Sequence, residues 1–204
     1  GNVGGGTGML CYELKGGTGT SSRKLPESMG GWTVGVLVQT NFGRRFQLTI
    51  AGVPVGAHLK DGTIWTNGEN PFVQDSGSLI IIVATDAPLL PHQLKRLAKR
   101  ASLGMARTGG LGGNGSGDIF MAFSTANMNA ARGDEKGLAA LQSITNDHLD
   151  QLLFSTAYAA EEAIINSMVA AEDMTGHKGV NIKALPHDKL KEVMKKYNRL
   201  ETTS

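Results

Sequence analysis

Cysteine, long apolar runs and an excess of charge of one sign are all scarce in this sequence. Cys11 is the only cysteine, which excludes an internal disulfide framework and a thiolate metal cluster and suits a small buried apolar residue. The longest apolar run, 79–84, is far shorter than the roughly 20 residues that span a bilayer. No basic segment followed by an apolar core marks a secretory signal. We therefore expect a soluble protein of the cytoplasm or periplasm that binds no membrane.

The small net charge argues against a nucleic-acid partner. Twenty basic and 18 acidic residues leave a formal charge of +2, and the basic residues form no stripe with interleaved aromatics. A chain of 204 residues suits one domain. Because it begins Gly-Asn-Val-Gly, we expect residues 1–204 to be a single domain that is incomplete at its N-terminus.

Several common catalytic motifs are also absent. The histidines show neither H-E-x-x-H nor a metal-ligand spacing with cysteine, so we expect no metal. Gly110, Gly112 and Gly115 match G-x-G-x-x-G, but here a helix precedes the loop and a strand follows it, the reverse of a dinucleotide site. No cofactor is expected. No G-x-S-x-G elbow occurs, although the partners of a Ser-His-Asp triad can lie anywhere in a chain.

Glycine, in contrast, is abundant, and the 28 glycines cluster. Average usage would give about half that number. Residues 4–8 and 16–23 read as glycine-rich loops around a short segment, and residues 107–118 form a third such loop. Glycine allows backbone conformations and close approaches that other residues do not, so these loops are candidates for a functional site.

The remaining pattern predicts alternating strands and helices. Residues 32–41 and 45–50 read as a hairpin, 79–84 as a central strand covered on both faces, and 119–125 as a strand after the third glycine loop. Apolar residues at 94, 97, 98 and 101 predict an amphipathic helix. A long helix begins near 146 or 147 and stops at 176, and a last helix covers 186–197. Residues 56–76 and 127–143 read as irregular segments.

The third glycine loop ends in the sequence Gly115-Ser116-Gly117-Asp118, directly before a predicted strand. A serine hydroxyl is a poor nucleophile until a base removes its proton, and the residue's own α-amine is one such base. An α-amine ordinarily has a pKa near 8, so a useful fraction is unprotonated at neutral pH without any histidine. This chemistry requires a free N-terminus at Ser116.

Cleavage of the bond between Gly115 and Ser116 would create that terminus. The Ser116 hydroxyl would attack the Gly115 carbonyl, take the acyl chain as an ester, and release it to water. Glycine on both sides leaves the carbonyl uncrowded and permits unusual backbone at the scissile bond. The plain alternative is that Gly-Ser-Gly is a flexible loop, and the tetrapeptide alone does not decide between the two.

Taken together, the segments resemble the L-aminopeptidase/D-amidase-esterases, a family that includes the beta-peptidyl aminopeptidases. The stretches that carry the resemblance are GGGTGM at 4–9, KGGTGTSSR at 15–23, VGVLVQTN at 34–41, IVATDAPLLP at 82–91 and NGSGDI at 114–119. Their order and combined length are more specific than any single glycine motif.

The resemblance implies a four-layer alpha-beta-beta-alpha sandwich of the N-terminal nucleophile type, within the α/β class. It also implies a precursor that cleaves itself, here into parts 1–115 and 116–204, and that assembles as a homotetramer of the cleaved pair. The implied substrates are short peptides and amino-acid amides or esters. The family's nucleophile corresponds to Ser116. Asn41 is the expected oxyanion-stabilising amide, with a plain turn residue as the alternative, and Tyr12 is expected to line the substrate site, with a packed aromatic as the alternative.

The family's hydroxyl and carboxylate two residues apart on the following helix fall at Ala160 and Glu162. Alanine has no hydroxyl, so Ser155 or Thr156 would have to substitute for it, and the neighbouring Glu161 reads as a solvated residue. The family's part before the cut is also longer than the 115 residues seen here. A self-cleaving acyltransferase of the ornithine acetyltransferase type and an inactive binding or scaffold homologue are the alternatives.

Overall fold

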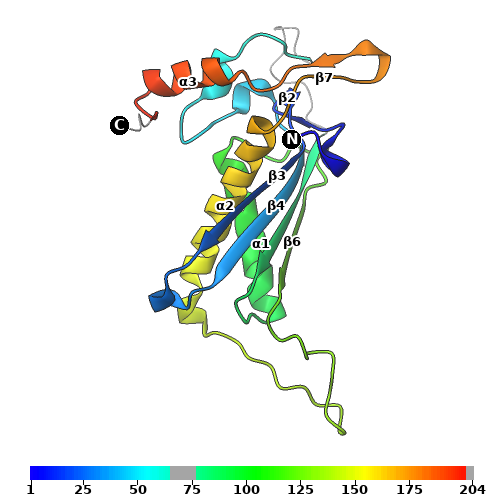
Figure 1. Cartoon of the computed structure of the whole chain (residues 1–204), viewed down its shortest axis with the longest axis vertical. Helices are drawn as coiled ribbons and strands as arrows, with labels where there is room; N and C mark the ends of the chain where they lie inside the picture. The colour runs from blue at the N-terminus through cyan, green and yellow to red at the C-terminus, as the bar shows by residue number, and fades with distance from the viewer. Residues whose placement is uncertain (65–76, 201–204) are drawn as a thin grey trace.

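The computed structural model of the chain describes residues 1–64 and 77–200 (Figure 1). Its α-helices vary from 10 to 20 residues and its strands from two to nine residues, and short 3-10 helices connect them. The strands are β1 (Leu10–Cys11), β2 (Leu14–Lys15), β3 (Thr18–Lys24), β4 (Thr33–Asn41), β5 (Ser78–Thr85), β6 (Ile119–Ser124), β7 (Met174–Thr175) and β8 (Asn181–Ile182). The α-helices are α1 (Pro91–Arg107), α2 (Asp150–Val169) and α3 (His187–Lys196). The 3-10 helices are η1 (Gly4–Gly6), η2 (Glu27–Met29), η3 (Arg45–Gln47), η4 (Val55–His58), η5 (Asn146–His148) and η6 (His177–Gly179).

A four-stranded sheet of order β3-β4-β5-β6 forms the centre of the molecule. Strand β4 pairs antiparallel with β3 and β5, while β5 and β6 run parallel. Leu79, Ile81 and Val83 of β5 are buried. The central position predicted for the strand at 79–84 is therefore confirmed, as is the strand that follows the third glycine loop, but the expected cover on both faces is wrong for this chain, since Ile80 is 37% exposed.

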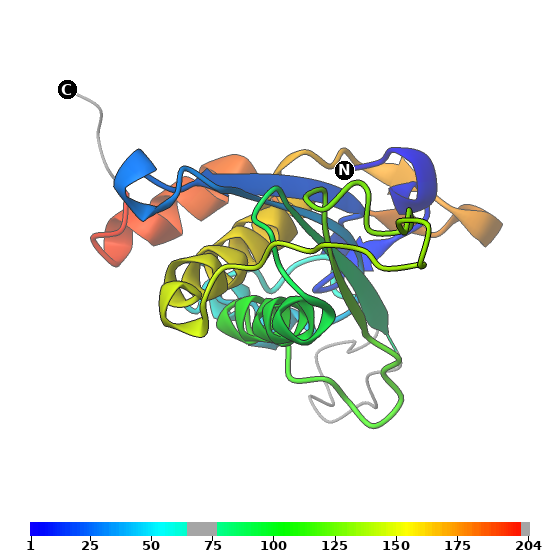
Figure 2. The same ribbon diagram turned by 90° about the horizontal axis from the view of Figure 1, so that it is seen from below.

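Helices α1 and α2 cover one face of this sheet and pack against each other (Figure 2). Both lie where the apolar periodicity predicted helices, with Leu97 and Ala101 of α1 and Leu152 and Ile164 of α2 buried. A Cβ at Gly104 of α1 would lie 2.5 Å from the Ala157 carbonyl oxygen of α2. Glycine at this position therefore sets how closely the two helices approach.

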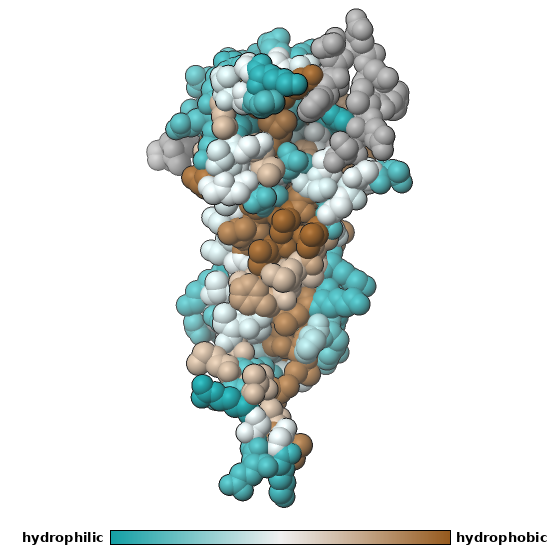
Figure 3. All heavy atoms as spheres, turned by 90° about the vertical axis from the view of Figure 1, so that its right-hand side faces the viewer, coloured by the Kyte–Doolittle hydropathy of each residue, from teal (hydrophilic) through white to brown (hydrophobic). Residues whose placement is uncertain are grey.

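The opposite face of the sheet is open. Side chains alternate between the two faces of a strand. The side chains that point away from the helices are apolar in the middle of the sheet. The large ones among them are between 37% and 56% exposed and belong to three neighbouring strands: Leu37, Ile80, Ile119, Met121 and Phe123. Figure 3 shows apolar atoms gathered along this side of the molecule. Contiguous exposed apolar surface of this kind marks an interaction surface.

Two of the expected elements are wrong. Residues 45–50 form no second strand of a hairpin, because the Arg45 guanidinium is held by buried carbonyl oxygens and the chain turns into η3 instead. The glycine-rich stretch at 16–23 is mostly strand β3, which pairs along β4 over seven residues. Gly19 of β3 lies where a Cβ would overlap the Ala163 carbonyl oxygen of α2, so that glycine serves helix packing.

The predicted end of the long helix at 176 is also wrong, because α2 ends at Val169 and the chain forms β7 before that position. Other predictions hold with small shifts. Helix α3 spans His187–Lys196, one residue shorter at each end than expected, and buries Val193 and Met194, while Tyr197 after its end is 41% exposed. The segment 127–143 is irregular and extends away from the sheet (Figure 1). Of the predicted surface loop 56–76, residues 65–76 lie outside the described residues. Cys11 is fully buried, and burial raises the pKa of its thiol to about 12.

Within residues 1–64 and 77–200, no helix combines the length and the apolar character needed to cross a bilayer. The compartment expected from the sequence stays a prediction.

We expect Gly104→Val to destabilise the fold, because the new side chain would overlap α2. Overpacking of this kind typically lowers the free energy of unfolding by about 1–3 kcal/mol. Chemical denaturation of the two variants Gly104→Val and Ala106→Val would measure it. Ala106 is exposed on the same helix, so its change to valine is the control, and equal stability of the two variants would contradict the packing account.

Candidate active site

Ser116 lies in the loop that connects α1 to β6, on a short turn closed by its own backbone. The Ser116 nitrogen donates to the Gly113 carbonyl oxygen at 2.8 Å. Gly115 is exposed and Ser116 is half-buried, so the bond between them is accessible. The loop's left-handed glycines are Gly109 and Gly112, with φ of 96° and 64°, which places the unusual backbone upstream of Gly115.

Two hydrogen bonds hold the residues after Ser116 against the start of β5. The Gly117 nitrogen donates to the Ser78 Oγ at 2.8 Å, and the Leu79 nitrogen donates to the Asp118 Oδ1 at 2.9 Å. The start of β5 and the segment before β6 are thus bonded to each other twice, which fixes where the chain enters β6. The arrangement explains how a glycine-rich loop can hold Ser116 in a defined place.

Asn41 is the last residue of β4 and pairs directly with Ser78 across the sheet. Paired residues of neighbouring strands point to the same face, so Asn41 and Ser78 share the open face. The Asn41 Oδ1 accepts a hydrogen bond from the Leu10 nitrogen at 3.3 Å. With the oxygen engaged, the Nδ2 group is the end of this amide that can donate to a ligand.

The site therefore extends across three neighbouring strands at one end of the sheet. Asn41 ends β4, Ser78 begins β5 and Ser116–Gly117 precedes β6. Acyl transfer uses a hydroxyl nucleophile together with an amide donor that stabilises the developing oxyanion. The structure brings two of the predicted residues, Ser116 and Asn41, to the same end of the open face.

Tyr12 lies in the core. Its side chain has no exposed surface, its hydroxyl is 2.7 Å from the Thr108 Oγ1, and its ring meets the edge of Phe42 at 5.1 Å between centroids. Thr108 begins the loop that carries Ser116. Contact between Tyr12 and a substrate stays a prediction, and the contact that the structure gives is with the start of the loop that carries Ser116.

Glu162 lies on α2 and contacts β3, the edge strand opposite β6. Its carboxylate accepts from Ser21 at 2.8 Å and forms an ion pair with Arg23 at 2.5 Å. Partial burial raises the pKa of Glu162, but the hydrogen bonds from Ser21 and Arg23 and the Arg23 charge bring it below its usual value. The structure does not bring Glu162 together with Ser116, and its part in a proton relay stays a prediction.

The hydroxyls considered as substitutes in that relay also lie on the helical side. Thr156 is fully buried and donates to the Leu152 carbonyl oxygen within its own helix at 2.8 Å, and Ser155 is buried. Ala160 is buried near Gly104. Glu161 is buried and bonded to Arg107 of α1, so its expected solvation is wrong.

Sequence reasoning assigned no role to Ser78 or Asp118. Asp118 stands within the quoted Gly-Ser-Gly-Asp motif, and a carboxylate two residues after Ser116 was a usable signal for a side chain that accepts a backbone hydrogen bond and holds the loop. Ser78 gave no such signal, because its contact with Gly117 depends on the parallel pairing of β5 with β6. That pairing joins segments about 40 residues apart in the chain.

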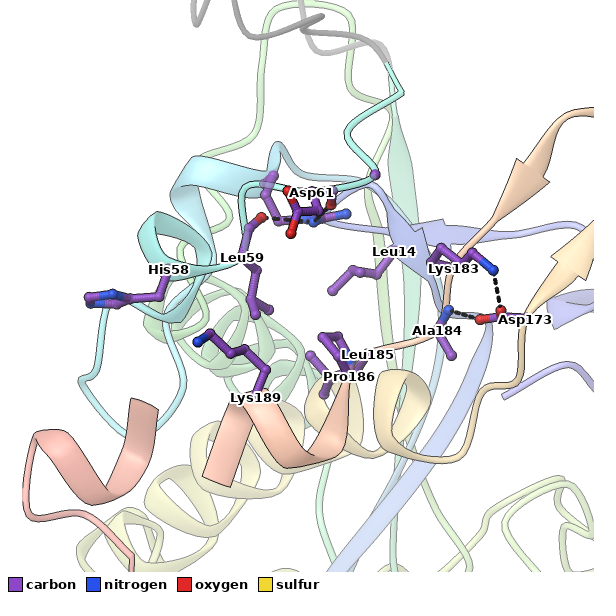
Figure 4. A pocket seen from close by; sticks show the side chains of 12 residues that line it. Leu14, His58, Leu59, Asp61, Asp173, Lys183, Ala184, Leu185, Pro186 and Lys189 are labelled. Atoms are coloured by element: carbon purple, nitrogen blue, oxygen red, sulfur yellow. Dashed lines mark hydrogen bonds and ion pairs between the residues drawn. The ribbon is translucent and has the colours of Figure 1, made fainter. Parts of the chain in front are cut away.

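A cavity of about 620 Å³ lies elsewhere, between η4, β2 and the start of α3 (Figure 4). Leu14, Leu59 and Leu185 give it an apolar wall. Four of its charged groups have protein partners: Lys183 bonds Asp173, Lys189 bonds Glu192, and Arg45 donates to backbone carbonyls. None of the predicted site residues lines it. Among the residues that the structure describes, no three His, Cys, Asp or Glu side chains are grouped to hold a metal ion.

Comparison with known proteins finds relatives along nearly the whole chain. This chain is 49% identical over 208 residues to the beta-peptidyl aminopeptidase BapA of Sphingosinicella microcystinivorans, and the alignment covers 98% of this chain and 52% of that protein. It is 43% identical over 201 residues to BapA of Sphingosinicella xenopeptidilytica, covering 96% of this chain and 50% of that protein. The chain thus spans about half the length of these relatives.

Solved structures agree. The L-aminopeptidase D-ala-esterase/amidase of Ochrobactrum anthropi, described as a prototype for the serine aminopeptidases and a new variant of the Ntn hydrolase fold, matches with a TM-score of 0.86 at 47% identity. A Burkholderia sp. beta-aminopeptidase matches with a TM-score of 0.82 at 44% identity. The first match covers 98% of this chain and the second covers 96%, and each corresponds to 53% of the solved structure's chain. Its sheet and two helices are thus part of an Ntn hydrolase fold.

The model of peptidase family S58 matches residues 1–182. With the identities above, this match shows that the chain belongs to peptidase family S58.

Proposed function

We propose that the chain is the nucleophile-bearing part of a self-processing serine aminopeptidase or amidase. The observation that carries the proposal is a clamp of two hydrogen bonds, Gly117 nitrogen to Ser78 Oγ and Leu79 nitrogen to Asp118 Oδ1, which ties the segment after Ser116 to the start of β5. Because Ser78 pairs with Asn41, that segment and Asn41 lie at the same end of the sheet. Family membership supports it, as do relatives that are named for beta-peptidyl aminopeptidase and L-aminopeptidase D-ala-esterase/amidase activities.

Self-cleavage comes first. The Ser116 Oγ attacks the Gly115 carbonyl carbon, the carbon–nitrogen bond breaks, and the nitrogen takes up a proton to become the α-amine of Ser116. Water then hydrolyses the ester, leaving a carboxylate on Gly115. The exposure of Gly115 gives water access to this ester.

Substrate hydrolysis uses the group that cleavage creates. The free α-amine accepts the proton of the Ser116 Oγ as the oxygen attacks a substrate carbonyl. The Asn41 Nδ2 donates to the oxyanion, which is the kind of interaction that contributes most to such reactions. The amine then protonates the leaving group, and water releases the acyl chain from Ser116.

The proposed substrates are short peptides and amino-acid amides or esters, with the residue at the N-terminus released. We also propose that a second sheet covers the open apolar face and completes the walls of the site, as the four-layer sandwich and the greater length of the relatives suggest. The homotetramer implied by the resemblance stays a prediction.

Replacing the nucleophile tests the proposal most simply. In the full-length protein, Ser116→Ala should leave one intact chain by denaturing mass spectrometry, whereas the wild type should separate into two pieces at Gly115–Ser116. The variant should not hydrolyse amino-acid p-nitroanilides. Ser22→Ala, an exposed serine on β3, is the control and should behave as the wild type. An uncut wild-type chain with full activity would exclude the mechanism.

Ser78→Ala tests the clamp. Removing the acceptor of the Gly117 nitrogen should loosen Ser116 and lower kcat by about tenfold, since small misplacements of reacting groups are costly, with KM little changed. Steady-state kinetics on a p-nitroanilide measures both. Asp118→Ala should act in the same direction. Unchanged kcat in both variants would show that the two bonds do not position the nucleophile.

A further inference from the structure

Lys15 is the last residue of β2 and is 1% exposed. Its ammonium donates to three backbone carbonyl oxygens, those of Gly6 at 3.1 Å, Met9 at 2.8 Å and Gly16 at 2.8 Å. These bonds use all three of its protons. Within residues 1–64 and 77–200 no carboxylate forms an ion pair with it. A buried charge with only peptide partners is costly to keep, which calls for a reason beyond packing.

The Met9 carbonyl and the Leu10 N–H belong to one peptide group. A peptide group is planar and rigid, so the bond from Lys15 to its oxygen also fixes the direction of its N–H. That N–H donates to the Asn41 Oδ1 at 3.3 Å. A continuous chain of hydrogen bonds therefore runs from the Lys15 ammonium through the peptide group to the Asn41 amide.

This chain has two effects on Asn41. It fixes which end of the amide accepts, and so leaves the Nδ2 protons for a ligand. It also polarises the bonds in one direction, because hydrogen bonds in series strengthen one another in a low-dielectric interior. The positive end of Lys15 draws electron density from the peptide, which makes the Leu10 N–H a stronger donor and the Asn41 Nδ2 protons more positive.

We propose that Lys15 is a positioning residue for the oxyanion-stabilising amide: it orients and polarises Asn41 through the peptide group of Met9 and Leu10. The inference rests on the proposed function, since it assigns Asn41 the oxyanion. Lys15 touches neither the substrate nor Ser116 in this arrangement and acts through another residue. The plain alternative is that Lys15 only holds the glycine-rich segment 4–9 against the hairpin of β1 and β2.

A double-mutant cycle on the full-length protein separates the two. Lys15→Met keeps the length and apolar stem of the side chain but removes its charge and donors. Loss of an oxyanion donor costs about 100-fold or more in kcat, so we expect Asn41→Ala to cost that much and Lys15→Met, which only disturbs the donor, to cost about tenfold. In the Asn41→Ala background, Lys15→Met should cost less than about twofold, because coupled residues are not additive.

Rates are taken per cleaved chain, with KM and the thermal midpoint recorded for every variant. Lys15→Gln, which keeps a donor for the Met9 carbonyl, should lose less kcat than Lys15→Met, and it carries the cycle if Lys15→Met does not fold. Lys183→Met is the control: its ammonium bonds Asp173 at 2.7 Å, and kcat should not change.

The inference would be overturned if the Lys15 variants lowered kcat by the same factor in the wild-type and Asn41→Ala backgrounds. It would also be overturned if they changed only KM. Failure of the proposed function has a different signature, namely hydrolysis that persists in Ser116→Ala. Equal losses in an enzyme that Ser116→Ala inactivates would therefore reject the role of Lys15 and leave the nucleophile in place.

Discussion

The arrangement of the site depends on the one-sided covering of the four-stranded sheet. Helices α1 and α2 bury one set of alternate side chains, and glycines at positions 19 and 104 let backbone approach backbone there. The other set faces outward, with apolar residues at the centre and the polar pair Asn41 and Ser78 at one end. Because β5 and β6 are parallel, the loop before β6 arrives at that same end and carries Ser116.

Two buried cations stabilise the segment beside the site, and among the described residues no carboxylate forms an ion pair with their charged ends. Lys15 donates to three carbonyl oxygens, and the Arg45 guanidinium donates to four, those of Tyr12, Glu13, Leu59 and Asp61. Burial lowers the pKa of Arg45, although the nearby Glu13 and Asp61 charges oppose this. The hairpin turn held in this way has φ of 52° at Tyr12 and 60° at Glu13. Such backbone costs on the order of 1–3 kcal/mol per residue and persists only where surrounding contacts impose it.

Sequence periodicity predicted what depends on local chemistry. The apolar run of β5, the amphipathic helices α1 and α2, and the glycine loop before β6 all have short-range signals. The strand β3 was missed because its glycines and hydroxyl residues look like a loop, and only pairing with the valine-rich β4 makes them a strand. The turn at η3 was missed because the contacts of Arg45 come from residues distant in the chain. Tyr12 is buried for the same reason, since Phe42 and Thr108 enclose it.

The central claim is that Ser116 is the reacting group. A sulfonyl fluoride reacts with activated serine hydroxyls, so the full-length protein treated with it can be digested and the adduct located by peptide mass spectrometry. The account predicts one adduct per active site, on a peptide that begins with Ser116 and has a free α-amine, with activity lost in proportion. Loss of activity with the adduct on another residue would contradict it.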